Sequence, residues 1–386
     1  MDSDERDLLL GTARKLAEKY DEHYWRQCAR EERFVDELWM DMAHAGILGL
    51  GIPEADGGFG GGMTELCMVT EEMAKISRVP VMLIVTGLAR IPILKYGTPL
   101  QRRQLVSETV SGRIRLCFAI TEPDAGTNTF RIQTLAMRQP DGSYLLNGQK
   151  VFISDVKDSH YVLVVTRTTP LNQVADRRNG ISLMMVDLTS PGVHYRELNI
   201  DVKKPERQFS LFFDNVRLSS EALLGDEGQG FRYLFDALNP ERQLAAASAL
   251  GTGYRALSKG VAYAKERTIF GNQPIGSYQA LQHPMAMARA RLDAARLMLY
   301  RAAALFDEGK SSGTESNMAK LLASEAGFEA CDIALQAHGG YGFDRDHEIF
   351  GLWEGSRVSK TAPINNHMIL NYIAEHVLGL PKSYAV

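Results

Sequence analysis

A glycine run is the first feature of this sequence that could bind a ligand. The segment Gly57-Gly58-Phe59-Gly60-Gly61-Gly62 could approach a phosphate, because glycine adopts backbone angles that other residues avoid. It matches neither a P-loop nor the GxGxxG pattern, so we interpret it as a flexible turn between helices. The four cysteines lie far apart without CxxC spacing, which disfavours a disulfide framework and a zinc site.

Residues 239–241 have the types and order of a helix start. Asn239 is a good N-cap and Pro240 suits the first helical position, so the spacing predicts a helix that begins here. Glu241 would then lie in the first turn, where the helix dipole favours an ionised carboxylate. A buried apolar pocket would favour the uncharged form, an effect that the helix end would partly offset.

The composition indicates an ordinary globular protein of two or three packed units. The chain has 386 residues, 45 % of them hydrophobic and 23 % charged, and its net charge of −4 gives no electrostatic basis for nucleic-acid binding. The acidic N-terminus lacks the features of a signal or transit peptide, and no apolar run approaches the roughly 20 residues of a membrane helix. We therefore expect a cytoplasmic enzyme without membrane insertion.

The elements that carry these residues follow the order helices, strands, helices. We predict a mostly α fold with a central β-domain: an N-terminal helical domain (1–112), an antiparallel β-barrel domain (113–222) and a C-terminal four-helix bundle (223–386). Apolar runs such as 161–165 and 181–186, separated by turn signals such as Asn147-Gly148, indicate the strands. Helical spacing over 241–267 and 277–307 indicates bundle helices.

Four motifs, in order along the chain, give the sequence a specific resemblance to the acyl-CoA dehydrogenases. Thr-Glu-Pro-Asp-Ala-Gly-Thr-Asn at 121–128 resembles TEPxAGSD, and Asn-Gly-Gln-Lys-Val-Phe-Ile-Ser at 147–154 resembles NGxKxWIT. Arg-Thr-Ile-Phe-Gly at 267–271 resembles RxxFG, and Gln-Ala-His-Gly-Gly-Tyr-Gly at 336–342 resembles QxxGGxG. The resemblance implies FAD, whose flavin N5 accepts a hydride from the β-carbon of an acyl-CoA while a carboxylate removes the α-proton.

The resemblance also assigns residues to the flavin. In the family a Trp lies against the isoalloxazine and a Thr contacts N5; Phe152 and Ser154 hold these positions here and keep an aromatic face and a hydroxyl. Thr127 matches a Ser near the pyrophosphate end of CoA or FAD. Three further residues match positions that contact the ring: Phe118, Ile120 and Thr121.

A second set of positions matches residues that bind FAD from elsewhere. Arg267 and Phe270 match residues that reach the FAD of a neighbouring subunit, which implies a homo-oligomer, either a dimer or a tetramer. Asn365 matches a position that contacts FAD. The stretch that holds the adenosine pyrophosphate, where glycine N–H groups can approach anionic oxygens, is matched by three residues: Gln336, Gly339 and Gly340.

The usual base of the family, the Glu of an EGT triplet, has two possible counterparts. Glu354 in Trp-Glu-Gly-Ser resembles it, but the EGT position falls near Pro363, nine residues or about 13 Å of helix further on. We therefore interpret Glu354 as a surface helix residue. Relatives such as isovaleryl-CoA dehydrogenase place the base in a segment LERxxxA, which residues 238–245 resemble, so Glu241 is the expected base and Asn239 and Arg242 are expected to contact the substrate.

Pro363 raises a question about the thioester carbonyl. In the family the N–H of the EGT Glu, together with a flavin ribityl hydroxyl, donates to this carbonyl, and proline has no N–H. Either Ile364 supplies the donor or the carbonyl is polarised in another way.

The expected reaction is α,β-dehydrogenation of a short or branched acyl-CoA, with electrons passing to an electron-transferring flavoprotein. Three alternatives stay open at this point. One is the reverse reaction of an enoyl-CoA reductase, and another is a flavin monooxygenase of the same fold, which needs no EGT carboxylate. The third is a silent homologue that binds an acyl-CoA or a partner protein.

Overall fold

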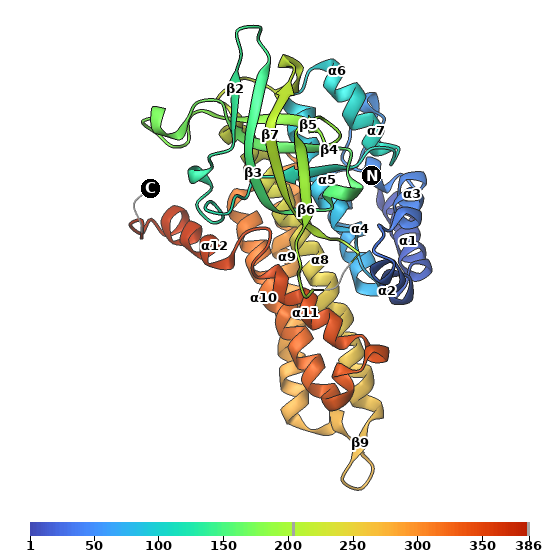
Figure 1. Ribbon diagram of the computed structural model, residues 1–386. Helices are drawn as coiled ribbons and strands as arrows, with labels where there is room; N and C mark the ends of the chain where they lie inside the picture. The colour runs from blue at the N-terminus through green and yellow to red at the C-terminus, as the bar shows by residue number, and fades with distance from the viewer. Residues whose placement is uncertain (203–204, 384–386) are drawn as a thin grey trace. The chain divides into compact units, whose positions relative to one another are not determined.

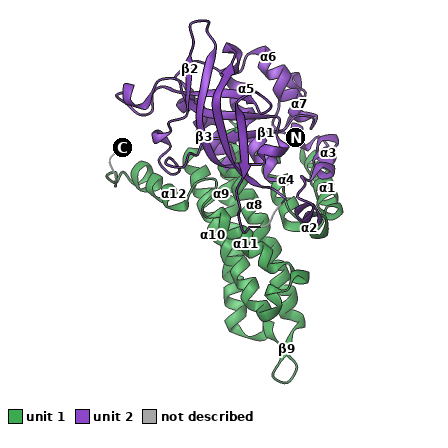
Figure 2. Ribbon diagram, in the orientation of Figure 1, with its two compact units in different colours: residues 1–24, 61–79, 242–386 green, residues 25–60, 80–241 purple. Residues whose placement is uncertain are grey.

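The computed structural model describes residues 1–202 and 205–383 and divides the chain into two compact units. Unit 1 comprises residues 1–24, 61–79 and 242–386, and unit 2 comprises residues 25–60 and 80–241 (Figures 1 and 2). No helix among the described residues is long and apolar enough to cross a membrane. The predicted division into three domains stays a prediction.

The first part of the chain is helical, as predicted. Its helices are α1 (Ser3–Lys19), α2 (Glu22–Arg30), α3 (Asp36–His44), α4 (Met63–Ile76), α5 (Val81–Tyr96), α6 (Pro99–Gln101) and α7 (Ser107–Val110). A capping box starts α1, because the side chains of Asp2 and Glu5 each accept the other's backbone N–H, at 2.9 and 2.8 Å. The glycine run at 57–62 connects a short 3₁₀ turn to α4, which agrees with its interpretation as a turn.

Helix α4 receives its N-terminal cap from a distant residue. Gly62 precedes the helix and has no side chain, but Asp307 ends α9 (Gln279–Asp307) beside it. The Asp307 carboxylate accepts the N–H of Met63 at 2.6 Å and the N–H of Thr64 at 2.9 Å. A Cβ at Gly62 would lie 2.4 Å from Asp307 Oδ1, so the contact requires glycine.

Eight strands among the described residues form one mixed sheet in unit 2, in the order β6-β7-β3-β2-β4-β5-β8 with β1 beside β4. They are β1 (Leu116–Ala119), β2 (Leu135–Arg138), β3 (Tyr144–Ser154), β4 (Tyr161–Arg167), β5 (Ile181–Asp187), β6 (Val193–Glu197), β7 (Gln208–Leu218) and β8 (Leu223–Leu224).

Strand β4 pairs in parallel with β1 and β2, so the prediction of a purely antiparallel domain is wrong. The long connection between β1 and β4 permits this parallel pairing. The described pairings do not close the sheet, and the barrel stays a prediction.

The central strands are buried on both faces, which explains their continuous apolar runs. Along β4, Leu163 and Val165 face one hydrophobic core, whereas Val162 and Val164 face the other. The core beneath Leu163 also contains residues of α5 and of the first turns of α8 (Gly230–Glu266). The predicted strands at 161–165 and 181–186 are confirmed for this reason.

The predicted turn at Asn147-Gly148 is wrong, because β3 continues through both residues. The register with β7 shifts between Leu146 and Gly148, and Gly148 has a φ of 145°. A Cβ there would lie 2.6 Å from Thr134 Oγ1. Glycine is therefore required by a close approach at a β-bulge rather than by a hairpin turn.

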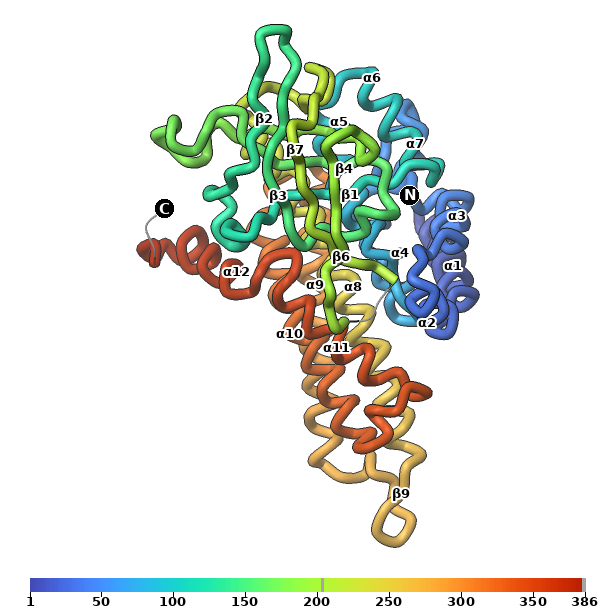
Figure 3. Tube along the Cα trace, viewed as in Figure 1, coloured from blue at the N-terminus to red at the C-terminus, as the bar shows by residue number. Residues whose placement is uncertain are grey.

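Unit 1 contains α8 from residue 242 onward and the other helices of the C-terminal part. After α8 and α9 come α10 (Gly313–His338), α11 (Ile349–Ser359) and α12 (Asn366–Tyr372), and the hairpin of β9 (Thr268–Ile269) and β10 (Gln273–Pro274) lies beyond the ends of α8 and α9 (Figure 3). Helices α8 and α10 approach closely, because a Cβ at Gly253 would lie 2.8 Å from the Cα of Gly327. Buried alanines and leucines fill the interface of α9 with α10.

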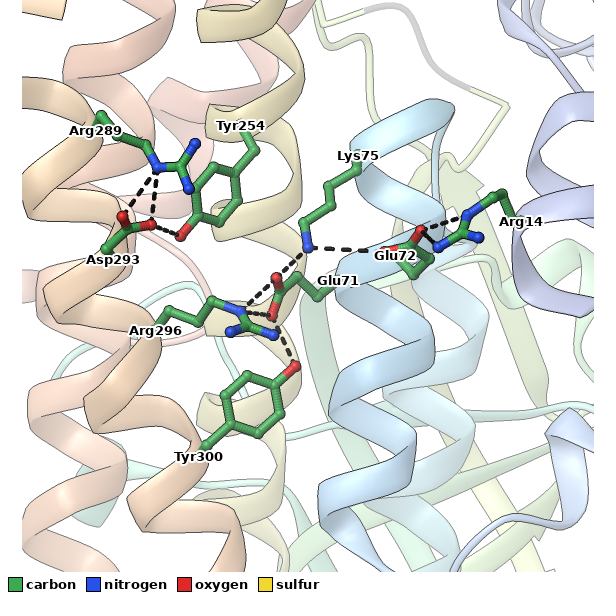
Figure 4. Close-up of polar contacts among 9 residues, drawn as sticks. All are labelled: Arg14, Glu71, Glu72, Lys75, Tyr254, Arg289, Asp293, Arg296 and Tyr300. Atoms are coloured by element: carbon green, nitrogen blue, oxygen red, sulfur yellow. Dashed lines mark hydrogen bonds and ion pairs between the residues drawn. The ribbon is translucent and has the colours of Figure 1, made fainter. Parts of the chain in front are cut away.

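Polar side chains also join α4, α8 and α9 within unit 1 (Figure 4). The Glu71 carboxylate, 1 % exposed, accepts from Arg296 Nε at 2.8 Å and from the Tyr300 hydroxyl at 2.7 Å. The Tyr254 hydroxyl donates to Asp293 at 2.6 Å. Burial raises the pKa of Tyr300, and the Glu71 carboxylate raises it further, so this hydroxyl stays a donor.

Candidate functional site

Phe152 is held outward by an irregularity in β3. The ladder between β3 and β7 shifts register between Lys150 and Ile153, and the N–H of Val151 donates instead to the carbonyl of Thr121 at 2.9 Å. Phe152 has a φ of 58° and is 63 % exposed. A left-handed conformation at a bulky residue costs roughly 1–3 kcal/mol and is found most often at functional sites. The fold therefore presents a flat aromatic face at this point.

Ser154 lies two residues beyond Phe152 and is oriented by a partner on β7. Its Oγ accepts from Gln208 Nε2 at 2.8 Å, and the two residues face each other in the β3–β7 ladder. Because the oxygen accepts, the hydroxyl hydrogen is left to donate to a ligand.

Strand β1 is joined to the same part of β3. The side chains of Phe118 and Ile120 pack on the core shared by β4, β5 and α5. The carbonyl of Ile120 accepts from Lys150 Nζ at 2.9 Å, and the carbonyl of Thr121 is the acceptor for Val151. The structure thus places Ile120 and Thr121 next to the part of β3 that leads to Phe152 and Ser154. Contact of these residues and Phe118 with a flavin stays a prediction.

A buried ion pair anchors the turn that follows β1. Lys150, which is fully buried, donates to Glu122 Oε1 at 2.9 Å, and Glu122 also accepts the backbone N–H groups of Gln133 and Thr134 at 2.7 and 3.0 Å. Burial raises the pKa of Glu122, but the ammonium of Lys150 and the N–H donors outweigh burial, so this pKa lies below its ordinary value. Thr127 lies in the same turn and is exposed, and its contact with CoA or FAD stays a prediction.

The predicted helix start at Asn239-Pro240 is wrong. Helix α8 begins at Gly230, so Pro240 lies inside it and Glu241 lies well beyond the first turn. Tyr233 and Leu234 are buried in the core of unit 2, and this packing extends the helix upstream of the proline. The dipole of α8 therefore does not favour an ionised Glu241 in the way that a first-turn position would.

Glu241 nevertheless lies on a helix that shares a core with Phe118 and Ile120. Its side chain is half-buried, and Leu238, one turn earlier, packs on the same core as Phe118 and Ile120. Asn239 is half-buried and Arg242 is buried. Their roles at the substrate stay predictions.

Glu354 lies within α11, which confirms the predicted helix, and its side chain is half-buried rather than fully exposed. Pro363 lies in the segment between α11 and α12, and the next residue, Ile364, has its carbonyl bonded to the buried ammonium of Lys320 at 2.6 Å. Asn365 is the N-cap of α12, because its side chain accepts the N–H of His367 at 2.8 Å.

The residues predicted to reach a neighbouring subunit gather at one end of unit 1. Arg267 follows α8, and Phe270, in the turn of the β9–β10 hairpin, is 85 % exposed with a φ of 40°. Tyr263 near the end of α8 stacks on His338 at the end of α10, with ring centroids 4.3 Å apart. The stack joins the ends of α8 and α10, and three residues at the end of α10 and just beyond it are exposed: Gln336, Gly339 and Gly340.

A groove of 470 Å³ runs between α9 and α10, but none of the predicted site residues lines it. Its floor includes Ala295 and Ala326, and Arg291 and Glu329 form an ion pair at 2.6 Å on its wall. No group of three His, Cys, Asp or Glu side chains suited to a metal is present in the described part of the chain.

Sequence comparisons identify the family. The chain matches the acyl-CoA dehydrogenase N-terminal domain over residues 3–113, the middle domain over 117–216 and the C-terminal domain over 228–378. The chain belongs to the acyl-CoA dehydrogenase family. It is accordingly an oxidoreductase, as predicted.

Individual relatives agree with this family. The acyl-CoA dehydrogenase FadE12 of Mycobacterium tuberculosis is 38 % identical over 388 residues, which cover 100 % of this chain and 98 % of FadE12. The 3-(aryl)acrylate reductase of Clostridium sporogenes is 31 % identical, covering 92 % of this chain and 94 % of the reductase. The structure of butyryl-CoA dehydrogenase from Megasphaera elsdenii superposes with a TM-score of 0.91 at 27 % identity, covering 98 % of this chain and 100 % of that one.

Strand β7 supplies a residue of this region that the motifs do not indicate. Gln208, which orients Ser154, lies 54 positions along the chain from it, outside all four motifs. Only the pairing of β3 with β7 brings the two side chains together, and no local pattern indicates that pairing.

Proposed function

We propose that this enzyme binds FAD and removes two hydrogens from the α- and β-carbons of an acyl-CoA thioester, with a short or branched chain as the preferred substrate. The observation that carries the proposal is Phe152, an exposed aromatic ring held at a positive φ beside the Ser154 hydroxyl. A planar ligand with hydrogen-bonding edges fits such a wall, and the isoalloxazine of FAD is one.

The residues present fit FAD. Phe152 offers a flat apolar face, and Ser154 offers a hydroxyl hydrogen because Gln208 already donates to its oxygen. When bound, FAD supplies the acceptor for a hydride. Phe152 would cover the ring and limit the access of water to it, and Ser154 would orient the edge of the ring that faces β3.

Glu241 is the proposed base. Its carboxylate would take the proton from the α-carbon, a step that needs an acceptor in reach of the substrate and partly shielded from water. The half-buried side chain on α8 supports this assignment, as does the match of 238–245 to the segment that carries the base in isovaleryl-CoA dehydrogenase-like members. Asn239 and Arg242 would orient the substrate from the same helix.

Ile364 is the proposed donor to the thioester carbonyl. Pro363 has no N–H, and no hydrogen bond joins the N–H of Ile364 to any described residue. Lys320 holds the carbonyl of Ile364 and the side chain of Asn366, at 2.6 and 2.7 Å, and so restrains the segment. A restrained amide can stabilise the negative charge that develops on the thioester oxygen.

A homo-oligomer and an electron-transferring flavoprotein are the proposed partners. Arg267 and Phe270 are exposed at the end of unit 1, a position that suits contact with the FAD of another subunit. Gln336, Gly339 and Gly340 would bind the adenosine pyrophosphate of that FAD, and Asn365 would contact it as well.

The reverse reaction is the second candidate. The Clostridium sporogenes relative is named a reductase, and the same base and hydride geometry serve both directions by microscopic reversibility. An enoyl-CoA reductase would use Glu241 to return a proton to the α-carbon.

Anaerobic titration of the purified protein with acyl-CoAs of different chain length and branching tests the proposal. We expect the purified protein to show the visible absorbance maximum of oxidised flavin. We expect acyl-CoA to bleach this absorbance faster when its chain is short or branched than when it is long. The reduced protein should be reoxidised by the matching enoyl-CoA more slowly than it was reduced. Colourless protein that takes up no added FAD would contradict the proposal, and reoxidation faster than reduction would favour the reductase.

A further inference from the structure

Asp155 directly follows Ser154 and has a buried carboxyl group. Its side chain has no exposed surface. Its Oδ1 accepts the N–H of Arg207 at 3.0 Å, and its own N–H donates to the Arg207 carbonyl at 2.8 Å. This pair extends the β3–β7 ladder by one step beyond Ser154 and Gln208. The carboxyl group thus replaces a backbone acceptor at the end of the ladder.

The second oxygen of this carboxyl group has no partner. Asp155 Oδ2 is buried, and no hydrogen bond to it is found in the described part of the chain. A carboxylate in this position would hold a charge away from water with one oxygen uncompensated, which is unfavourable. Burial raises the pKa of Asp155 well above its ordinary value, and the nearby Glu206 carboxylate raises it further.

Among the described charged groups around Asp155, Arg207 favours the ionised form and Asp158 disfavours it, and the effect of burial outweighs that of Arg207. The guanidinium of Arg207 extends toward Glu197 on β6 at 3.2 Å and Asp158 in the turn after β3 at 3.5 Å. Glu206 accepts the N–H of Val81 at the start of α5. From β1, the buried thiol of Cys117 faces the group, and it is uncharged at neutral pH because burial raises its pKa to about 12.

The backbone around Ser154 depends on this ladder end. Phe152 and Asp155, on either side of it, both have positive φ, at 58° and 53°. Two left-handed residues within four positions are a strained arrangement that surrounding contacts must maintain. The hydrogen bonds of Asp155 to Arg207 are among the contacts that do so.

We propose that Asp155 is a positioning residue, whose uncharged carboxyl group holds the end of the β3–β7 ladder and with it the Ser154 hydroxyl and the Phe152 ring. The role at the flavin rests on the proposed function. Ionisation draws the carboxylate toward water, opens the end of the ladder and loosens the hold on Ser154 and Phe152. These two side chains are therefore held more firmly in acidic than in alkaline solution.

The sign of the pH dependence follows from the protonated native state. The folded chain binds one more proton than the unfolded chain between the unfolded pKa of Asp, about 3.9, and the raised folded pKa. Stability from this group is complete below the lower value and is lost as pH rises toward the higher one. Over that window the unfolding equilibrium constant rises about tenfold per pH unit.

Asp155→Asn tests the proposal, because asparagine keeps Oδ1 and the size of the side chain, tolerates a positive φ and cannot ionise. Denaturant unfolding is measured for both proteins between pH 5 and pH 9. The unfolding equilibrium constant of wild type should rise relative to that of D155N by up to about tenfold per pH unit. FAD affinity should weaken toward pH 9 in wild type and stay level in D155N. Asp214→Asn, which removes an exposed carboxylate of β7, is the control and should keep the wild-type profile.

Glu206→Gln gives a second measurement if D155N folds poorly. Removing the Glu206 carboxylate should lower the pKa of Asp155 in the folded protein. The loss of stability with rising pH should therefore be complete at a lower pH than in wild type. Parallel stability profiles for wild type and D155N, or an unchanged profile in E206Q, would overturn the role of Asp155. Failure of every variant to bind FAD, with the stability difference intact, would support the ladder role and contradict the proposed function instead.

Discussion

Glu241→Gln is expected to slow flavin bleaching by an acyl-CoA about a thousandfold, within the range by which a general base accelerates a reaction. Glutamine has nearly the same size, so the half-buried position is filled, but its amide cannot accept the α-proton. FAD content and thermal stability should remain close to wild type. Stopped-flow absorbance under anaerobic conditions measures the rate, and the visible spectrum measures the bound flavin.

Glu354→Gln is the matched control for this experiment. Glu354 also lies in a helix and is half-buried, so both variants remove one carboxylate from a comparable environment. We expect E354Q to bleach at the wild-type rate. Normal bleaching in E241Q together with loss in E354Q would move the base to α11 and would show that the spacing argument from Pro363 is misleading.

Lys150→Met is expected to lower the free energy of unfolding by about 3–5 kcal/mol, the range found when one partner of a buried ion pair is removed. Methionine fills the space, but the Glu122 carboxylate stays buried and loses the ammonium, while the N–H groups of Gln133 and Thr134 still donate to it. The hydrogen bond from Lys150 to the Ile120 carbonyl is lost as well, so Phe152 and Ser154 farther along β3 should be held less firmly and FAD should bind more weakly. Urea titration and FAD content measure the two effects.

Lys360→Met provides the comparison. Lys360 pairs with Glu325 at 2.7 Å, but both side chains are partly exposed, so its loss should change stability by less than about 1 kcal/mol. The double variant E122Q/K150M should recover much of the stability lost in K150M, since an uncharged amide is less costly to bury than a carboxylate. Equal losses in K150M and K360M would contradict the view of the buried pair as an anchor.

Local patterns predicted those parts of the fold that local burial determines. The strands at 161–165 and 181–186 have apolar residues on both faces, and the structure covers both faces. The same reasoning failed at Asn239-Pro240, where a good cap and a proline indicate a helix start. Packing of Tyr233 and Leu234 outweighs that signal, and the helix begins at Gly230.

The candidate site was predictable to the extent that motifs carry it. Phe152 and Ser154 were assigned by resemblance, and the structure adds the bulge and the positive φ that present them. Gln208 and Asp155 were not predicted. Gln208 meets Ser154 only because two strands distant in the sequence pair with each other. Asp155 has a raised pKa because it is buried, and burial cannot be read from a single sequence.

The carboxylate of Asp307 joins the start of α4 to the end of α9, two segments that are far apart in the sequence. The amides of Met63 and Thr64 find their acceptor 243 or more positions later in the sequence. While the chain is being synthesised, these donors can bond only to water until the second long helix of the C-terminal part is complete. The first turn of α4 is thus among the last pieces of the N-terminal helices to become secure.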